Sequence, residues 1–222
     1  MRRDADETNA DGTDADDETQ PPPVVLEEHD NIAVLRINRP EQRNSLSVAT
    51  LLSLDSAFDA LSARPAVTAV IFTGAANVFA SGADIRELQT LTPDSARAFA
   101  ERGQRLFRRI AEARQLTIAA VNGFCMGGGL DLALACRVRV ASPSAVFAHP
   151  GARLGIITGW GGTQRLPRLV GAARALEMFT TARRLTASEA LDIGLVSHVH
   201  PDALACALEI ALNRNSYKRD RE

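Results

Sequence analysis

The feature that most constrains this sequence is a cluster of glycines that follows an apolar segment. Residues 116–130 are mostly apolar, but Asn122 and three consecutive glycines at 127–129 interrupt them. A buried strand before the glycines and a helix after them fit this pattern. The helix would begin with amide groups that have no intrahelical partner and no β-carbon in front of them. The segment therefore predicts a turn that can bind an anion, aided by the positive end of the helix macrodipole.

A second segment, residues 77–88, also follows a predicted strand. Ser81 and Gly82 allow the backbone to turn so that the N–H group of Ala83 points into a cleft. Taken alone, either segment could be an ordinary connecting loop. Two amides from separate loops that converge on one oxygen atom form an oxyanion hole, which stabilises developing negative charge. We therefore expect the N–H groups of Ala83 and Gly128 to act together.

The rest of the chain alternates between patterns typical of strands and patterns typical of helices. Strands are expected at 24–28, 32–37, 69–72, 117–121, 137–141, 145–147 and 196–199. Helices are expected at 46–61, 84–111 with a break near Pro93, 127–135, 163–169, 172–181, 187–193 and 202–213. This alternation predicts an α/β protein.

Composition divides the chain into a tail and one core. Residues 1–20 carry eight acids and two arginines, a net charge of −6, so the remainder carries +4 of the total of −2. Residues 1–23 lack aromatic side chains and end in three prolines, so we expect a disordered acidic tail. The 45% hydrophobic content of the 222 residues suits one core domain at 24–199, followed by a short helix and charged tail at 200–222.

Composition also argues against several classes of protein. The arginines are scattered without interleaved aromatic residues, so a small polyanion is a better ligand for the mildly basic core than a nucleic acid. No apolar run of about eighteen residues is present, so no membrane span is expected. The acidic N-terminus is unlike a targeting signal. The three cysteines are expected to be buried free thiols, which favours the cytoplasm. The sequence lacks metal-binding and dinucleotide-binding spacings, so we expect no cofactor.

Five motifs occur in a recognisable order. They are NRPEQRNSL at 38–46, FASGADIREL at 79–88, VNGFCMGGGLD at 121–131, GWGGTQRL at 159–166 and LTASEALDIGLV at 185–196. Together they resemble the enoyl-CoA hydratase/isomerase (crotonase) superfamily across residues 24 to about 199. The resemblance implies a spiral of ββα units, here with an abbreviated C-terminal helical region. It also implies an acyl-CoA thioester as substrate and a homo-oligomer, either a trimer or a dimer of trimers.

The resemblance further implies roles for individual residues. The N–H groups of Ala83 and Gly128 would stabilise a thioester enolate. Coenzyme A and the acyl group would be bordered by Arg43, Asn44, Ser45, Leu46, Ser81, Gly82, Asp84, Ile85, Arg86, Gly127, Gly151 and Trp160. Either Arg43 or Arg86 could bind a phosphate as a charged fork, and a solvated surface position is an equal alternative for each.

Two positions depart from the hydratase pattern, in which two carboxylates hold the attacking water. Asp131 occupies the first position, as in dienoyl-CoA isomerases, and we expect it to be the acid or base; the alternative is that it only complements a helix dipole. Gly151 occupies the second, as in dihydroxynaphthoyl-CoA synthases, and has no side chain to transfer a proton. Because a positioned acid or base contributes about 10²–10⁴ in rate, Gly151 argues against an ordinary efficient hydratase.

Three histidines are further candidates for the site. His149 is the nearest alternative proton carrier and would share a face with Gly151 if the strand continued, although a packed structural histidine is the stronger interpretation. His198 and His200 alternate like metal ligands, but no cysteine or carboxylate accompanies them, so both are interpreted as structural.

These observations leave three hypotheses. The first is an enoyl-CoA hydratase-like lyase, which we favour. The second is another crotonase reaction: isomerisation, decarboxylation or thioester hydrolysis. The third is a non-catalytic CoA-binding protein.

Overall fold

The computed structural model describes residues 21–219, with side chains up to residue 213. The disordered tail predicted at 1–23 therefore lies almost entirely outside the described residues. Within the described part, no helix combines the length and the apolar character needed to cross a membrane. The three cysteines are free and buried, as expected.

A six-stranded sheet forms the base of the fold, in the order β1-β2-β3-β5-β7-β10. Strands β1 (Val24–His29) and β2 (Ile32–Ile37) make the predicted antiparallel hairpin. The others run parallel to their neighbours: β3 (Ala69–Gly74), β5 (Leu116–Val121), β7 (Val138–Ala141) and β10 (His198–Val199). β3 is buried throughout, because a parallel sheet is covered on both faces.

A second sheet lies beside the first, in the order β4-β6-β8-β9. Its strands are short: β4 (Val78–Ala80), β6 (Phe124–Met126), β8 (Val146–Ala148) and β9 (Leu185–Thr186). Each of β3, β5 and β7 continues into the next strand of the second sheet and then into helical structure. The helices that follow are α2 (Ile85–Gln89), α3 (Pro93–Glu112), α4 (Gly128–Ala135) and α5 (Gly162–Val170). The fold is the expected α/β spiral of ββα units.

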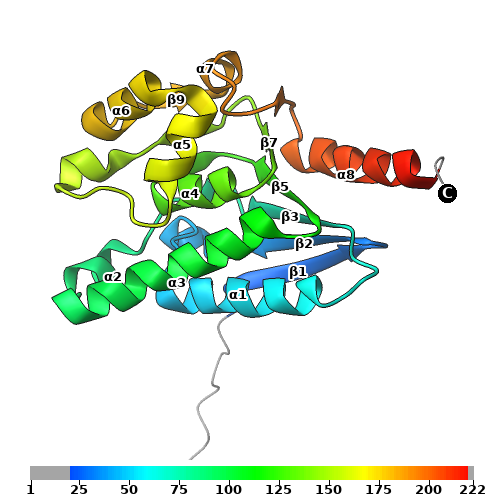
Figure 1. The fold of residues 1–222 in the computed structure, drawn as a ribbon, viewed down its shortest axis with the longest axis horizontal. Helices are drawn as coiled ribbons and strands as arrows, with labels where there is room; N and C mark the ends of the chain where they lie inside the picture. Colours follow the sequence, from blue (N-terminus) through cyan, green and yellow to red (C-terminus); the bar gives the residue numbers. More distant parts are fainter. Residues whose placement is uncertain (1–20, 220–222) are drawn as a thin grey trace, which may run out of the picture.

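Helices cover both faces of the large sheet (Figure 1). On one face, α1 (Val48–Ser62) and α3 close the main core over β2, β3 and β5. On the other face, α8 (Ala203–Arg219) packs on β3, β5 and β7 through small side chains such as Ala207. The remaining helices are η1 (Pro40–Gln42), η2 (Pro150–Leu154), α6 (Ala172–Thr181) and α7 (Ala187–Asp192).

Several predicted boundaries were wrong. The helix expected from residue 46 begins at Val48, because the side chain of Ser47 accepts a hydrogen bond from the amide of Thr50 and caps the helix. The strand expected at 196–199 is reduced to two residues, and the helix expected to end at 213 continues to Arg219. The three short strands β4, β6 and β9 were not predicted.

Candidate active site

Strand pairing sets the direction of the Ala83 amide. Residues Leu46 and Ala83 form an isolated parallel bridge, in which the Leu46 N–H donates to the carbonyl of Gly82 at 2.7 Å. In a parallel bridge, the carbonyl of the residue before Ala83 and the N–H of the residue after it face Leu46. The N–H of Ala83 itself therefore faces the opposite way. That N–H has no hydrogen-bond partner among residues 21–219. It is available to a ligand.

The amide of Gly128 lies beside that of Ala83. Gly128 is the first residue of α4, and the first hydrogen bond of this helix joins the Asp131 N–H to the Gly127 carbonyl at 3.0 Å. The Gly128 N–H is therefore also unpaired within the described part of the chain. A β-carbon built on Gly82 would lie 3.2 Å from the Gly128 nitrogen, and one built on Gly128 would lie 3.5 Å from the Ala83 nitrogen. The two loops thus bring the two amides together.

Both amides border a largely apolar cavity of about 270 Å³. Trp160 forms one wall; it is 3% exposed, packs against Phe99 and Phe107, and lies so close to Gly128 that a β-carbon there would come within 2.3 Å of its ring. Side chains from several elements complete the wall, namely Ile85, Leu88, Phe99, His149, Leu154, Ile156, Ile157, Thr158 and Phe179. The amides therefore face an environment in which hydrogen bonds to a charged oxygen are strong.

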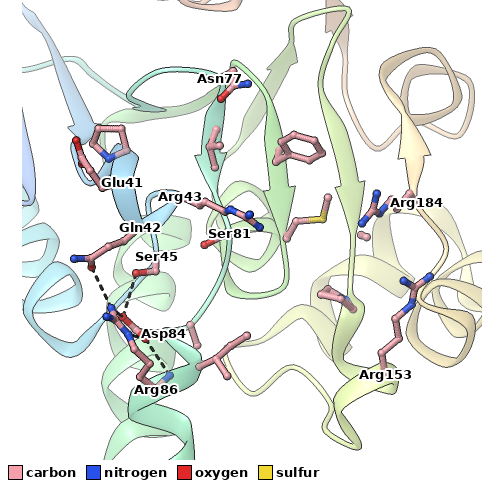
Figure 2. A pocket seen from close by; sticks show the side chains of 18 of the residues that line it. Glu41, Gln42, Arg43, Ser45, Asn77, Ser81, Asp84, Arg86, Arg153 and Arg184 are labelled. Carbon is pink, nitrogen blue, oxygen red and sulfur yellow. Dashed lines mark hydrogen bonds and ion pairs between the residues drawn. The ribbon is translucent and has the colours of Figure 1, made fainter.

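A wider cleft of about 840 Å³ adjoins this cavity. Ser81, Ala83, Ile85 and Pro150 line both spaces, so the cleft reaches the cavity at the Ala83 amide. Figure 2 shows Arg153 and Arg184 on the side of the cleft opposite Gln42 and Arg86, with Arg43 between the two sides.

Three of the arginines in this cleft carry uncompensated charge. Within residues 21–213, the guanidinium groups of Arg43, Arg153 and Arg184 make no ion pair. Arg86 differs, because its Nη2 lies 2.8 Å from Oδ2 of Asp84. The hydrogen bonds from Arg86 lower the pKa of Asp84 to about 2. The cleft therefore offers three free guanidinium groups to an anionic ligand, whereas Arg86 is already paired.

Three predicted site residues lie outside both spaces, namely Asn44, Leu46 and Asp131. Asn44 is fully buried, and its side-chain amide donates to the carbonyls of Ala75 and Val78 at 2.9 and 2.6 Å. Leu46 is fully buried and belongs to the main core. Asn44 and Leu46 shape the loop that holds Ala83 and contribute no side chain to the cleft.

Asp131 lies behind the cavity wall. It is fully buried in the first turn of α4, and its Oδ2 accepts a short hydrogen bond from the hydroxyl of Thr158, which does line the cavity. Its Oδ1 has no hydrogen-bond partner in the described part of the chain. Burial raises the pKa of Asp131 to about 7, even though Thr158, the backbone of Trp160 and the charge of Arg165 oppose the shift. The carboxyl group is therefore suited to exchange a proton near neutral pH.

His149 separates Asp131 from the cavity. Its ring packs against Phe179 with centroids 4.9 Å apart, and its Nε2 lies 3.7 Å from Oδ1 of Asp131. Neither ring nitrogen has a hydrogen bond to any residue that the structure describes. Burial lowers the pKa of His149 to about 4, so the free ring is neutral at pH 7. The 3.7 Å contact therefore involves a neutral imidazole ring and lies just beyond hydrogen-bond length.

Gly151 lines the cavity, but not in the way expected. It lies in the 3₁₀ helix η2 and not on a strand, because Pro150 ends the strand, so the expectation of a shared strand face with His149 is wrong. A β-carbon at Gly151 would lie 2.4 Å from the carbonyl oxygen of Ile156. The backbone here leaves no room for a side chain of any kind.

Other cavity residues carried no usable signal in the sequence. Thr158 lies in an irregular loop after η2, where neither periodicity nor a motif distinguishes it. Arg153 and Arg184 were two scattered arginines among many, and only the tertiary structure brings them to one cleft. His198 and His200 are exposed, and their Nδ1 atoms contact Ser197 Oγ and the Asp202 carbonyl at 2.9 and 2.8 Å. In the described residues, no cluster of three metal-binding side chains is present.

The fold brings two neighbouring N–H donors to the junction of a charged cleft and an apolar cavity. The family model described as enoyl-CoA hydratase/isomerase matches residues 27–215. This chain belongs to that family.

Named relatives agree with this assignment. A crotonyl-CoA hydratase of Syntrophomonas wolfei is 46% identical over 177 residues, which cover 79% of this chain and 68% of the relative. A short-chain-enoyl-CoA hydratase of Clostridium acetobutylicum is 44% identical with the same coverage of each chain. The structure of an enoyl-CoA hydratase from Bacillus anthracis has a TM-score of 0.83 at 36% identity, covering 86% of this chain and 76% of that one.

Proposed function

We propose that this protein is an enoyl-CoA hydratase-like lyase, which adds water across the double bond of a 2-enoyl thioester of coenzyme A. The observation that carries the proposal is the pair of adjacent, unbonded amides of Ala83 and Gly128 at the edge of the apolar cavity. The thioester oxygen gains negative charge as water attacks, and preorganised donors stabilise that charge. The amides supply the electrophile, so we expect no metal ion or redox cofactor.

The charged cleft suits the nucleotide of coenzyme A. Arg43, Arg153 and Arg184 provide guanidinium groups that bind phosphates through paired hydrogen bonds. The cleft meets the cavity at Ala83, so one extended ligand with phosphates at one end and a thioester at the other fits both spaces. The apolar side chains around Trp160 suit a short hydrocarbon acyl group.

Asp131 is the proposed source of acid–base chemistry. Its pKa of about 7 allows it to accept a proton from water and to return it within one turnover. Two relatives that are 46% and 44% identical are named as hydratases of crotonyl-CoA and of short-chain enoyl-CoA, which supports this reaction and a short acyl chain.

The test is the hydration of crotonyl-CoA, followed through loss of the absorbance of the conjugated thioester. Ala83→Pro removes an N–H that makes no hydrogen bond to any residue within 21–219, so the rate should fall by roughly 10²–10³. Ala83→Ser is the matched control, since it adds an atom at the same position but keeps the N–H, and it should stay close to the parent rate. Equal rates in both variants would end the proposal.

Gly151 keeps a second reaction open, the isomerisation of a double bond. Isomerisation moves one proton between carbon atoms and adds no water, so one acid–base group near the cavity is sufficient. Analysis of products from 2-enoyl and 3-enoyl thioesters separates hydration from isomerisation. The same analysis detects decarboxylation and thioester hydrolysis, and ligand binding without any product would favour a non-catalytic CoA-binding protein.

A homo-oligomer, a trimer or a dimer of trimers, remains part of the proposal. Leu154, Ile156 and Ile157 border the cavity yet are 53%, 48% and 65% exposed, which suits a surface that another copy covers. Light scattering would give the mass of the particle in solution, and a monomer at working concentration would contradict the proposed oligomer.

A cytoplasmic location is also part of the proposal. It is supported by the three buried free thiols.

A further inference from the structure

The most unusual polar arrangement in the described residues lies at the back wall of the cavity. Asp131 Oδ1 and both ring nitrogens of His149 are the buried side-chain nitrogen and oxygen atoms that lack a hydrogen bond in the described part of the chain. Buried polar groups are normally bonded, and each one that is not requires an explanation. These three atoms belong to two neighbouring groups, with Nε2 and Oδ1 3.7 Å apart.

The surroundings favour contact between the two groups. Thr158 holds Oδ2 of Asp131, so the unbonded Oδ1 is the oxygen that faces the imidazole ring. Phe179 packs on that ring and keeps it beside Asp131. The charge of Arg165 lowers the pKa of Asp131, and Asp131 in turn raises the pKa of the Cys125 thiol. Among the described residues, neither the Arg165 guanidinium nor the Cys125 thiol makes a hydrogen bond to Asp131 or His149. His149 borders the cavity and Asp131 does not.

We propose that His149 is the catalytic residue that exchanges a proton with the substrate, and that Asp131 is a positioning residue that acts through the imidazole ring. The proposal rests on the proposed function and refines it, because it moves the point of proton transfer from the carboxyl group to the ring. The gap of 3.7 Å would close to a hydrogen bond when substrate fills the cavity. Catalytic hydrogen bonds are often long in the absence of substrate.

The steps balance with one proton carrier. The His149 ring takes a proton from water as the water oxygen bonds to C3, and the π electrons of the double bond move onto the thioester oxygen held by the two amides. The resulting imidazolium is stabilised by the Asp131 carboxylate. The imidazolium then gives its proton to C2 as the enolate collapses, which restores the starting state. No second carboxylate at position 151 is needed.

The test compares His149→Gln, Asp131→Asn and the double variant in crotonyl-CoA hydration. Gln keeps a polar side chain of similar length but cannot accept and release a proton near neutral pH, so kcat should fall by about 10²–10⁴-fold. Binding of butyryl-CoA, measured by calorimetry, should be unchanged. The double variant should be no slower than the slower single variant, because two groups that act as a unit are not additive. His198→Gln, at an exposed histidine outside the cavity, is the control and should match the parent.

A second measurement keeps this proposal separate from the proposed function. Exchange of the C2 hydrogens of butyryl-CoA in deuterium oxide requires the enolate and a base but no addition of water. The exchange should be lost in His149→Gln to the same degree as hydration. If the parent protein exchanges these hydrogens but hydrates nothing, the hydratase proposal fails and the role of His149 stands.

Three results would overturn the role of His149. The first is parent-like kcat and exchange in His149→Gln while Ala83→Pro remains inactive. The second is loss of butyryl-CoA binding in step with kcat, which would indicate a packing role. The third is a rate loss in the double variant equal to the product of the two single losses, which would show that Asp131 does not act through the ring.

Discussion

Thr158 affects the protonation of Asp131, which lies behind the cavity wall. Its hydroxyl donates to Oδ2 of Asp131, and this hydrogen bond lowers the carboxyl pKa against the rise caused by burial. Removing the bond must therefore raise the pKa above its present value of about 7. A larger fraction of the carboxyl group is then protonated at pH 7.

We expect Thr158→Val to move the acidic limb of the kcat/KM profile to higher pH and to lower activity at pH 7. Activity should recover at more alkaline pH, where the carboxylate forms again. Thr158→Ser keeps the hydroxyl group and should keep the position of the limb. A pH–rate profile measures this, and a uniform loss at every pH would show that Thr158 only shapes the wall.

At the scale of elements, Trp160 joins the cavity to helix α3. A β-carbon on Gly103 of this helix would lie 2.4 Å from the indole ring, whose other edge lies against Gly128. In an open helix, Gly→Ala stabilises by about 1 kcal/mol. At Gly103 the forced contact with the indole ring should make the same substitution destabilising, because overpacking typically costs about 1–3 kcal/mol.

Gly103→Ala should therefore lower the melting temperature and change the tryptophan fluorescence. Trp160 is the single tryptophan, so the fluorescence reports on this wall alone. Glu101→Ala, at an exposed position in the same helix, is the matched control and should change neither quantity. An unchanged or higher melting temperature in Gly103→Ala would mean that the ring has room to move.

How far the sequence predicted these elements depended on their length and periodicity. The helix from Pro93 and the strand ending at Val121 carry long regular patterns, and both were placed within two residues. β4, β6 and β9 have two or three residues each, too few to show a period of two, and pairing with distant segments defines them.

The sequence predicted the backbone groups of the site better than the placement of its side chains. The amides of Ala83 and Gly128 follow from local glycine-rich turns, and the structure brings them together. The placement of Asp131 behind His149 depends on how α4 packs against the loop that contains Thr158, which spacing along the chain does not encode. For the same reason, Asn44 and Leu46 were expected at the cleft but are buried beneath it.

For the whole molecule, the two buried groups give opposite dependences of stability on pH. Asp131 has a pKa of about 7 in the folded protein against an ordinary value of 3.8, so the folded state holds the extra proton and stability falls as pH rises through that range. His149 has a folded pKa of about 4 against 6.5, so the unfolded state holds the extra proton and stability falls as pH drops from 6.5 towards 4.

Asp131→Asn should therefore gain stability relative to the parent protein as pH rises from about 4 to about 7, and the difference should level off above that range. Denaturant unfolding at a series of pH values measures the difference in free energy. Leu52→Ala serves as the control, because it replaces an exposed side chain and changes no titratable group. A difference that is constant with pH would mean that the carboxyl group titrates normally.

The N–H donors at Ala83 and Gly128 are main-chain groups, so a change of side chain leaves them in place. Mutation at position 83 changes the size and polarity of the side chain, but every residue except proline still presents the same N–H. If the cavity holds the acyl group as proposed, mutation can change its shape while both N–H donors are kept. A substitution at this site can therefore alter which substrate fits the cavity without removing either N–H donor.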